Sequence, residues 1–217
     1  MSHLDARPLM FVVSGPSGAG KGTALRFLTE RSLLQRVPTY TTRQPREHEK
    51  PGEDYVFVSE EEFFRLHDEG TIFEYTRTYS ASYYGSPQRL LADGQSGPLL
   101  TELDPGGFVR VRAASQRRVI GIFVTTASED ELRHRLHLRG QGDEANQRLR
   151  IRTDQLTWAW VYDYVLLNED REQFLRDLET VVRSEILRSD GARRMLELKA
   201  ESNPTLLDAE DSRKNSG

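Results

Sequence analysis

The sequence contains no cysteine and no long hydrophobic run. The lack of cysteine excludes disulfides, thiolate metal sites and thiol nucleophiles, and it fits a reducing cytoplasm. A membrane-spanning helix needs about 20 mostly apolar residues in succession, and the apolar run near the N-terminus is too short for the core of a signal peptide. We therefore expect a soluble cytoplasmic protein.

Neither sign of charge is in large excess, because 30 basic residues face 34 acidic ones and the formal net charge is -4 at pH 7. This balance gives no indication of the basic footprint of a nucleic-acid-binding protein or of a polybasic membrane patch. We expect small-molecule partners, with no nucleic acid and no membrane. The oligomeric state, monomer or homodimer, stays open.

Residues 9–23 read LMFVVSGPSGAGKGT, an apolar strand candidate followed by a glycine-rich loop and a lysine. Glycines let backbone N–H groups approach a phosphate chain, the following helix adds its positive end, and the lysine reaches the terminal phosphates. A polyphosphate site is predicted at Gly15, Pro16, Ser17, Gly18, Ala19, Gly20, Lys21, Gly22 and Thr23. Gly22 stands where the strict motif has Ser or Thr, which leaves open whether the Thr23 hydroxyl binds Mg²⁺.

Strand and helix patterns alternate along the 217 residues, which fit one domain with subdomains. Strands are predicted at 9–13, 72–75, 98–103, 119–124 and 161–167, and helices at 23–34, 59–70, 128–140 and 174–186. The alternation predicts an α/β fold with a parallel sheet flanked by helices. The polar segment 39–59 is expected to be a functional loop that closes in a strand, and 1–8 and 191–217 are expected to be flexible, although the start of the second of these segments also fits a helix.

Two arginines, Arg43 and Arg46, stand three apart in TTRQPR, with Tyr55 beyond them. The planar guanidinium holds a phosphate through two hydrogen bonds, and a tyrosine hydroxyl adds another donor. The segment therefore suits a phosphate monoester. A solvated charged loop is the alternative.

Glu74 precedes the run Tyr83, Tyr84, Gly85, Ser86. A carboxylate accepts two hydrogen bonds at once, and guanine offers two adjacent donors on its Watson–Crick edge. Glu74 is thus a candidate guanine reader. The alternative is a glutamate at a strand end that faces water.

A second basic group contains Arg135 and Arg139, four apart on one predicted helical face. Gly140 and Gly142 would let Arg148 fold back toward them, as a mobile lid requires. Such arginines can neutralise the charge on a transferring phosphoryl group. An exposed basic helix is the alternative.

Taken together, five segments resemble the guanylate kinase family of P-loop nucleoside monophosphate kinases. They are SGPSGAGKGT, TTRQPREHEKPGEDYVFVS, the FE before SYYGS, SEDELRHRLHLRG and YDYVLLNED, in the family's order over residues 8–187. The resemblance implies a P-loop core at 9–38 and 98–190, a nucleoside-monophosphate-binding subdomain at 39–97 and a lid at 139–150. It also implies an ATP-dependent, Mg²⁺-dependent kinase that converts GMP or dGMP to the diphosphate.

The same resemblance implies roles for individual residues. Lys21 would hold the phosphates of ATP, and Arg135, Arg139 and Arg148 would close over the transferring group. The acceptor site would comprise Thr39, Arg43, Arg46, Glu49, Tyr55, Glu74, Tyr83 or Tyr84, Ser86 and Asp104, with Asn168 matching a family asparagine. The acceptor phosphate is already a dianion at neutral pH, because its second pKa lies near ~6, so no general base is needed.

Three departures from the family pattern keep the acceptor open. The link from Glu74 to Gly85 is one residue longer, the lid is about two residues shorter, and TELDPGG replaces the usual LDID followed by QG. Asp104 before Pro105 also fits a plain helix cap. A kinase for a modified nucleotide monophosphate or a sugar bisphosphate, and a non-catalytic interaction module, are the alternatives.

Overall fold

A five-stranded sheet forms the centre of the computed structural model, which describes residues 5, 7–31, 34–78, 81–92, 97–126 and 154–202. All neighbouring strands of this sheet pair in parallel. In spatial order they are β2 (Gln35–Arg36), β7 (Leu99–Glu102), β1 (Leu9–Ser14), β8 (Arg118–Thr125) and β9 (Tyr164–Leu167). The predicted α/β class with a parallel sheet is confirmed.

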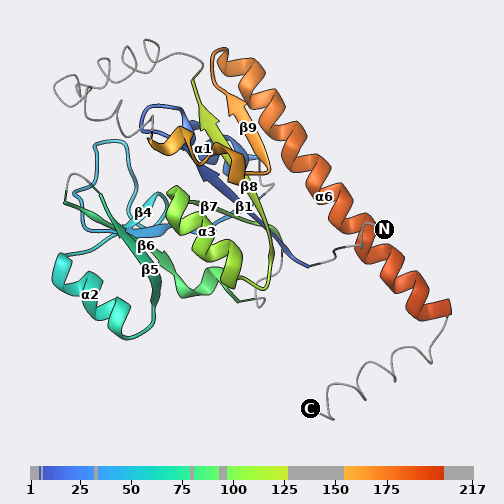
Figure 1. Ribbon diagram of the computed structural model, residues 1–217, viewed down its shortest axis with the longest axis horizontal. Helices are drawn as coiled ribbons and strands as arrows, with labels where there is room; N and C mark the ends of the chain where they lie inside the picture. Colours follow the sequence, from blue (N-terminus) through green and yellow to red (C-terminus); the bar gives the residue numbers. More distant parts are fainter. Residues whose placement is uncertain are drawn as a thin grey trace.

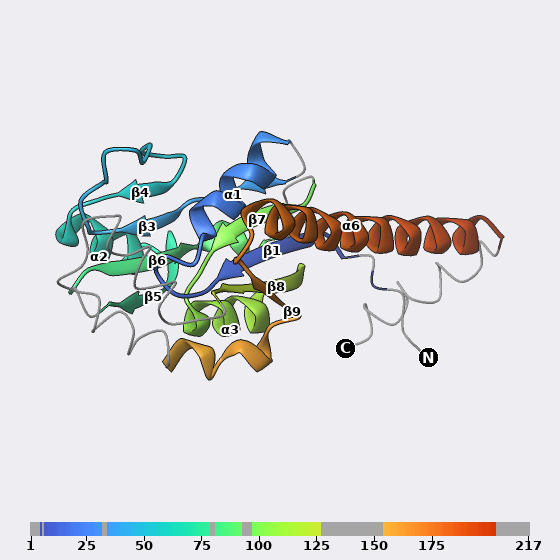
Figure 2. The same ribbon diagram turned by 90° about the horizontal axis from the view of Figure 1, so that it is seen from above.

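Helices cover both faces of this sheet, as Figure 2 shows from above. Helices α1 (Lys21–Glu30) and α6 (Arg171–Ser202) lie on one face, and α3 (Pro105–Ala114) lies on the other. Side chains of β1 alternate between the two layers, so Phe11 and Val13 join the core under α1 and α6 while Met10 and Val12 join the core under α3. All of β1 is buried, which explains the unbroken apolar run from Leu9 to Val13.

A smaller mixed sheet stands beside the first (Figure 1), and its strands all lie between residues 39 and 87. Its order is β4 (Tyr55–Phe57), β3 (Thr39–Thr41), β6 (Tyr83–Pro87) and β5 (Ile72–Arg77). Strands β3 and β4 run parallel, whereas β6 is antiparallel to both β3 and β5. Segment 39–59 therefore contains two short strands of this second sheet around a loop, and none of the core sheet.

Helix α2 (Glu60–Asp68) packs on the smaller sheet and lies within the predicted helix 59–70, with Ser59 as its N-cap. The Ser59 hydroxyl accepts a hydrogen bond from the Glu62 backbone N–H at 3.1 Å, and three glutamates occupy the first turn. Negative charge at a helix N-terminus complements the helix dipole. The local signals at this helix were strong enough to fix its start.

Strands β2 and β6 were not expected, and the strand predicted at 161–167 begins at Tyr164. Three α-helices also differ from the prediction. Helix α1 begins two residues earlier than expected and ends at Glu30. Helix α3 was not expected, and α6 continues to Ser202 although 191–217 was expected to be flexible. Figure 1 shows the far end of α6 projecting beyond the two sheets. The predicted helix at 128–140 and the lid at 139–150 lie outside the described residues.

No helix in the described part of the chain is both long enough and apolar enough to span a bilayer. Strands β7 and β1, which run side by side, both end at the edge of the sheet that faces the smaller sheet. Ligands of open parallel α/β sheets bind at the carboxyl ends of the strands. The site residues described next gather at this edge.

Candidate functional site

The glycine-rich loop connects the end of β1 to the start of α1. Gly15 has a φ of +138°, and a Cβ there would lie 2.0 Å from the carbonyl oxygen of Val124 on β8. Gly20, with a φ of +109°, precedes α1 as its N-cap and brings no side chain to that position. The loop thus packs tightly on the sheet. Because Gly20 has no side chain, the N-cap residue makes no side-chain hydrogen bond to the start of α1.

Asn168 holds this loop from the opposite side. Its Nδ2 donates a hydrogen bond of 2.7 Å to the Ala19 carbonyl, and the side chain is buried at the end of β9. A Cβ at Gly20 would lie 2.1 Å from the same Nδ2 atom. Asn168, which the family resemblance singled out, therefore positions the phosphate loop.

Lys21 is the first residue of α1, and its ammonium group lies over the loop. Nζ donates to the carbonyl oxygens of Gly15 at 2.7 Å and Pro16 at 3.0 Å. It also lies 3.5 Å from Oε1 of Glu102, the last residue of β7. The lysine is thus placed at the rim of the loop, where it can reach a terminal phosphate. Thr23 follows within the first turn of α1.

Glu102 joins the phosphate loop to the smaller sheet. Its Oε2 accepts a hydrogen bond of 3.0 Å from the Tyr55 hydroxyl on β4, while its Oε1 faces Lys21. Burial, together with the charge of Glu102, raises the pKa of Tyr55 well above its ordinary value. Tyr55 is therefore a neutral hydrogen-bond donor at physiological pH. The sequence indicated Glu102 only as a departure from the family pattern, and its bridging position was not predicted.

Arg43 lies at the centre of a compact charged cluster. Its two Nη atoms donate to the two carboxylate oxygens of Glu49, each at 2.7 Å, and its Nε donates to the Tyr84 hydroxyl at 2.7 Å. The guanidinium carbon lies 4.9 Å from the ring centroid of Tyr55. Arg43 is thereby held rigidly by three groups that the sequence analysis had placed in the acceptor site.

Arg46 shares the same carboxylate. Its backbone N–H donates to Glu49 at 2.9 Å, and its Nη1 lies 3.6 Å from the other carboxylate oxygen. Burial alone would raise the pKa of Glu49, but the hydrogen bonds from Arg43 and Arg46 lower the pKa overall. Two guanidinium groups around one carboxylate leave a local excess of positive charge, which suits a phosphate dianion.

Tyr83 belongs to a different cluster from Tyr84. Neighbouring residues on a strand point to opposite faces, and the Tyr83 ring packs against Phe64 with 5.0 Å between centroids. It also contacts Phe63 and Tyr75 under α2. Of the two tyrosines offered by the sequence, the structure brings Tyr84 to Arg43 and places Tyr83 in the aromatic packing of the smaller sheet.

Glu74 and Ser86 face each other across β5 and β6. They are register partners, and the Ser86 hydroxyl donates to Oε1 of Glu74. Both side chains are buried, as is Thr39 on the neighbouring part of the sheet. Ser86 therefore lies beside Glu74, although the link from Glu74 to Gly85 is one residue longer than the family pattern.

Asp104 caps helix α3. Its Oδ1 accepts a hydrogen bond of 2.9 Å from the Gly107 backbone N–H, and Pro105 occupies the first helical position. This is the helix-cap role that the Asp–Pro pair suggested. The same helix carries Arg110, which contacts Glu74 and was not predicted, since nothing in the sequence connects two residues 36 positions apart.

The predicted lid arginines Arg135, Arg139 and Arg148 lie outside the described residues. Within the described part, the other predicted residues, apart from Tyr83 in the aromatic packing and Asp104 in the cap of α3, form two groups. One is the phosphate loop with Lys21, and the other is the acceptor group on the smaller sheet. The hydrogen bond from Tyr55 to Glu102 and the 3.5 Å approach of Lys21 to Glu102 connect them.

Comparison with known proteins agrees with this arrangement. The guanylate kinase family model matches residues 6–185. The chain is 31% identical over 193 residues to the guanylate kinase of Ehrlichia ruminantium (strain Gardel), covering 87% of this chain and 92% of that protein. It is 34% identical over 187 residues to the guanylate kinase of Caldanaerobacter subterraneus subsp. tengcongensis, covering 84% and 90%.

Among solved structures, the crystal structure of guanylate kinase from Anaplasma phagocytophilum superposes with a TM-score of 0.66 at 29% identity, covering 82% of this chain and 86% of that chain. The matches span both sheets and include the phosphate loop and the acceptor group. The chain belongs to the guanylate kinase family of nucleoside monophosphate kinases.

Proposed function

We propose that this protein is an ATP-dependent guanylate kinase, which transfers the γ-phosphoryl group of ATP to GMP or dGMP and yields ADP and the diphosphate. The observation that carries the proposal is the Glu102 bridge. Glu102 contacts Lys21 of the phosphate loop on one oxygen and Tyr55 of the acceptor group on the other. A donor phosphate at the loop and an acceptor phosphate at Arg43 would therefore meet around this residue.

The acceptor phosphate would be held by Arg43, Arg46, Tyr55 and Tyr84. Arg43 and Arg46 already share one carboxylate, Glu49, and Arg43 is fixed by the Tyr84 hydroxyl. A phosphate monoester dianion can accept from several of these donors at once, and Tyr55, which has a single hydroxyl hydrogen, would release Glu102 to donate to it. Glu49 acts here as the residue that holds the two arginines together.

The base would be read by Glu74 and Ser86, with Thr39 on the adjacent strand. Glu74 is a buried carboxylate at the side of the smaller sheet that faces α3, and Ser86 contacts it directly. Guanine suits this group because its ring N–H and exocyclic amine are adjacent donors. Adenine presents no such pair on its Watson–Crick edge, so we expect AMP to be a poor acceptor.

Catalysis by these residues needs alignment and charge neutralisation only. The attacking oxygen belongs to a phosphate whose second pKa lies near ~6, so no proton has to be removed at neutral pH. Lys21 would neutralise charge on the donor phosphates, and Arg43 would hold the acceptor in line. We further propose that Arg135, Arg139 and Arg148 close over the reacting groups.

Mg²⁺ fits the oxygen donors at this edge. The ion typically binds one or two protein oxygens together with phosphates and waters. Thr23 in the first turn of α1 offers a hydroxyl, and Glu102 at the end of β7 offers a carboxylate close to Lys21. Bound there, Mg²⁺ would neutralise phosphate charge.

We also propose a cytoplasmic location, because ATP and nucleoside monophosphates are intracellular metabolites.

The test is a coupled assay of ADP formation with Mg·ATP against GMP, dGMP, IMP, AMP, CMP, UMP and ribose bisphosphate. We expect turnover with GMP and dGMP well above the other acceptors. Lys21→Ala, as control, should lose at least about 100-fold in kcat, the usual effect of removing one transition-state charge partner. Glu74→Gln should weaken discrimination against IMP and AMP. Preferential turnover of another acceptor would refute the proposal.

A further inference from the structure

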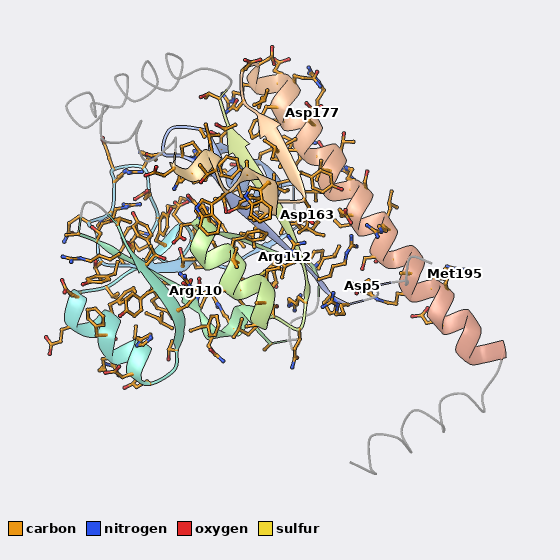
Figure 3. All side chains as sticks on the ribbon, in the orientation of Figure 1. Asp5, Arg110, Arg112, Asp163, Asp177 and Met195 are labelled. Carbon is orange, nitrogen blue, oxygen red and sulfur yellow. The ribbon has the colours of Figure 1, made fainter. Side chains whose placement is uncertain are left out.

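Arg110 of α3 makes a direct contact with the base-reading group of the smaller sheet. Its Nε donates to Oε2 of Glu74 at 2.8 Å and its Nη2 donates to the same oxygen at 2.5 Å. Nη2 also donates to the Thr76 hydroxyl at 3.0 Å. Only 9% of the Glu74 side chain is exposed, against 45% for Arg110. Figure 3 shows Arg110 on the side of α3 that faces the smaller sheet.

Two glycines at the start of α3 make room for this ion pair. A Cβ at position 106 would lie 3.1 Å from Nη1 of Arg110, and a Cβ at position 107 would lie 3.0 Å from Oε1 of Glu74. Both distances are shorter than ordinary carbon contacts, so a side chain at either position would crowd the pair. Both glycines belong to the TELDPGG stretch, which departs from the family pattern. The departure from the family pattern and the ion pair therefore occur together.

The hydrogen-bonding capacity of Glu74 is nearly full. A carboxylate has about four lone-pair positions, two on each oxygen. Ser86 uses one on Oε1, and Arg110 uses two on Oε2. Guanine needs one position on each oxygen, for its ring N–H and its exocyclic amine. Oε1 has a position left for the first donor, whereas the second donor must displace one of the Arg110 hydrogen bonds.

We propose that Arg110 is a specificity-determining residue that competes with guanine for Oε2 of Glu74. The inference rests on the proposed function and adds a residue to its acceptor site. GMP binding exchanges one Arg110 hydrogen bond for one from the exocyclic amine, so the competition raises the KM for GMP. IMP lacks that amine and needs only Oε1, so its binding leaves Arg110 in place. Arg110 thereby reduces the difference between the KM values for GMP and IMP.

The experiment compares Arg110→Met with Arg112→Met, using the full chain and the ADP-formation assay. Methionine keeps an unbranched apolar side chain but donates no hydrogen bond. Arg112 lies on the same helix with a similar exposed fraction of 42%, and it pairs with Asp163 instead of Glu74. Figure 3 shows Arg112 on the side of α3 nearer Asp163. KM and kcat are measured for both GMP and IMP in each variant.

We expect Arg110→Met to lower the KM for GMP about fivefold, the size of a partly exposed ion pair. The KM for IMP should stay within about twofold, and kcat for GMP should also stay within about twofold. Arg112→Met should leave both KM values unchanged. Arg110→Lys, which offers one ammonium in place of a two-pronged guanidinium, should give a KM for GMP between those of the methionine variant and the natural protein.

A KM for GMP that rises or stays constant in Arg110→Met would overturn the inference, as would equal changes for GMP and IMP. A rise would mean that Arg110 orients Glu74 for the base and does not compete with it. Thermal unfolding of each variant checks that the fold is intact. If the natural protein does not turn over GMP, the proposed function fails and the inference fails with it. Turnover of GMP without the expected shift in KM sinks the inference alone.

Discussion

Gly15 is the residue of the phosphate loop where a single methyl group should do most damage. Its φ of +138° lies in a region that other residues adopt at a cost of about 1–3 kcal/mol. A Cβ would also lie 2.0 Å from the Val124 carbonyl oxygen, a backbone atom of the central sheet that cannot move aside alone. We therefore expect Gly15→Ala to reduce the free energy of unfolding by at least about 3 kcal/mol.

Thermal unfolding followed by circular dichroism measures this loss. For a chain of 217 residues each kcal/mol shifts the Tm by about 2–4 °C, so Gly15→Ala should lower the Tm by about 6–12 °C. ATP binding, measured by calorimetric titration below the Tm, should weaken as well. The reason is that the Gly15 carbonyl accepts a hydrogen bond from Lys21, and the loop must shift to admit the methyl group.

Gly22→Ala is the matched control in the same loop. Apart from its chain neighbours and the nearby backbone of α1, no heavy atom in the described part of the chain lies within 4 Å of a Cβ built at Gly22, which is part of α1. Alanine is favoured over glycine in a helix by about 0.5–1 kcal/mol, so the Tm should rise by about 1–4 °C. A Tm for Gly15→Ala as high as that of the natural protein would refute this account of the loop.

Three further outcomes follow from the site. The pKa of Glu49 is lower in the folded protein than its ordinary value of 4.5, so its pairing with arginine stabilises the fold above pH 4.5. This stabilisation is lost as the pH falls through the lower pKa of the folded protein. In a plot of the free energy of unfolding against pH, Glu49→Gln should therefore flatten the slope at acid pH. Asp104→Ala should cost about 1 kcal/mol in urea unfolding through loss of the helix cap, whereas Asp104→Asn should retain stability; loss of turnover in Asp104→Asn would reveal a role for its charge beyond capping. Glu102→Gln should bring the pKa of Tyr55 closer to its ordinary value, seen in ultraviolet titration by difference from Tyr55→Phe, and an unchanged titration would contradict the contribution of the Glu102 charge.

Local signals in the sequence predicted the elements that depend on neighbouring residues. The apolar run of β1, the glycine-rich loop and the Ser59 cap each carry their cause within a few residues. Helix α3 carried a conflicting signal, because Asp104 and Pro105 fit a helix start whereas Gly106 and Gly107 in its first turn favour a turn. The cap of Asp104 and packing of Phe108 and Val111 on the sheet outweigh the low helix propensity of the glycines.

In helix α6, the residues that favour a helix outweigh the signals that suggested a flexible tail. Its segment after Ser189 contains Gly191 and many charges, which suggested a flexible tail. Alanine, arginine, leucine, glutamate and lysine in the same segment are good helix formers, and one glycine costs only about 1 kcal/mol against them. The helix therefore continues from the packed part that includes Val182 to Ser202.

The residues of the functional site also differ in whether local sequence could indicate them. Lys21, Arg43 and Glu74 could be predicted as site residues because their chemistry is visible in short motifs. The contacts of Glu102 with Tyr55 and of Arg110 with Glu74 were missed, since they join residues 47 and 36 positions apart through the packing of two sheets and α3. Such partners depend on tertiary structure, and periodicity along one chain carries no information about them.

The connection from β7 into α3 has a mechanical consequence. Glu102 at the end of β7 holds Tyr55, and Arg110 on α3 holds Glu74, so two contacts to the smaller sheet arise from residues 102–110. Asp104 fixes the geometry between them through its cap. A rotation of the smaller sheet away from the core would strain both contacts together, so its opening and closing should behave as one concerted step whose amplitude is set by the rigidity of this short turn.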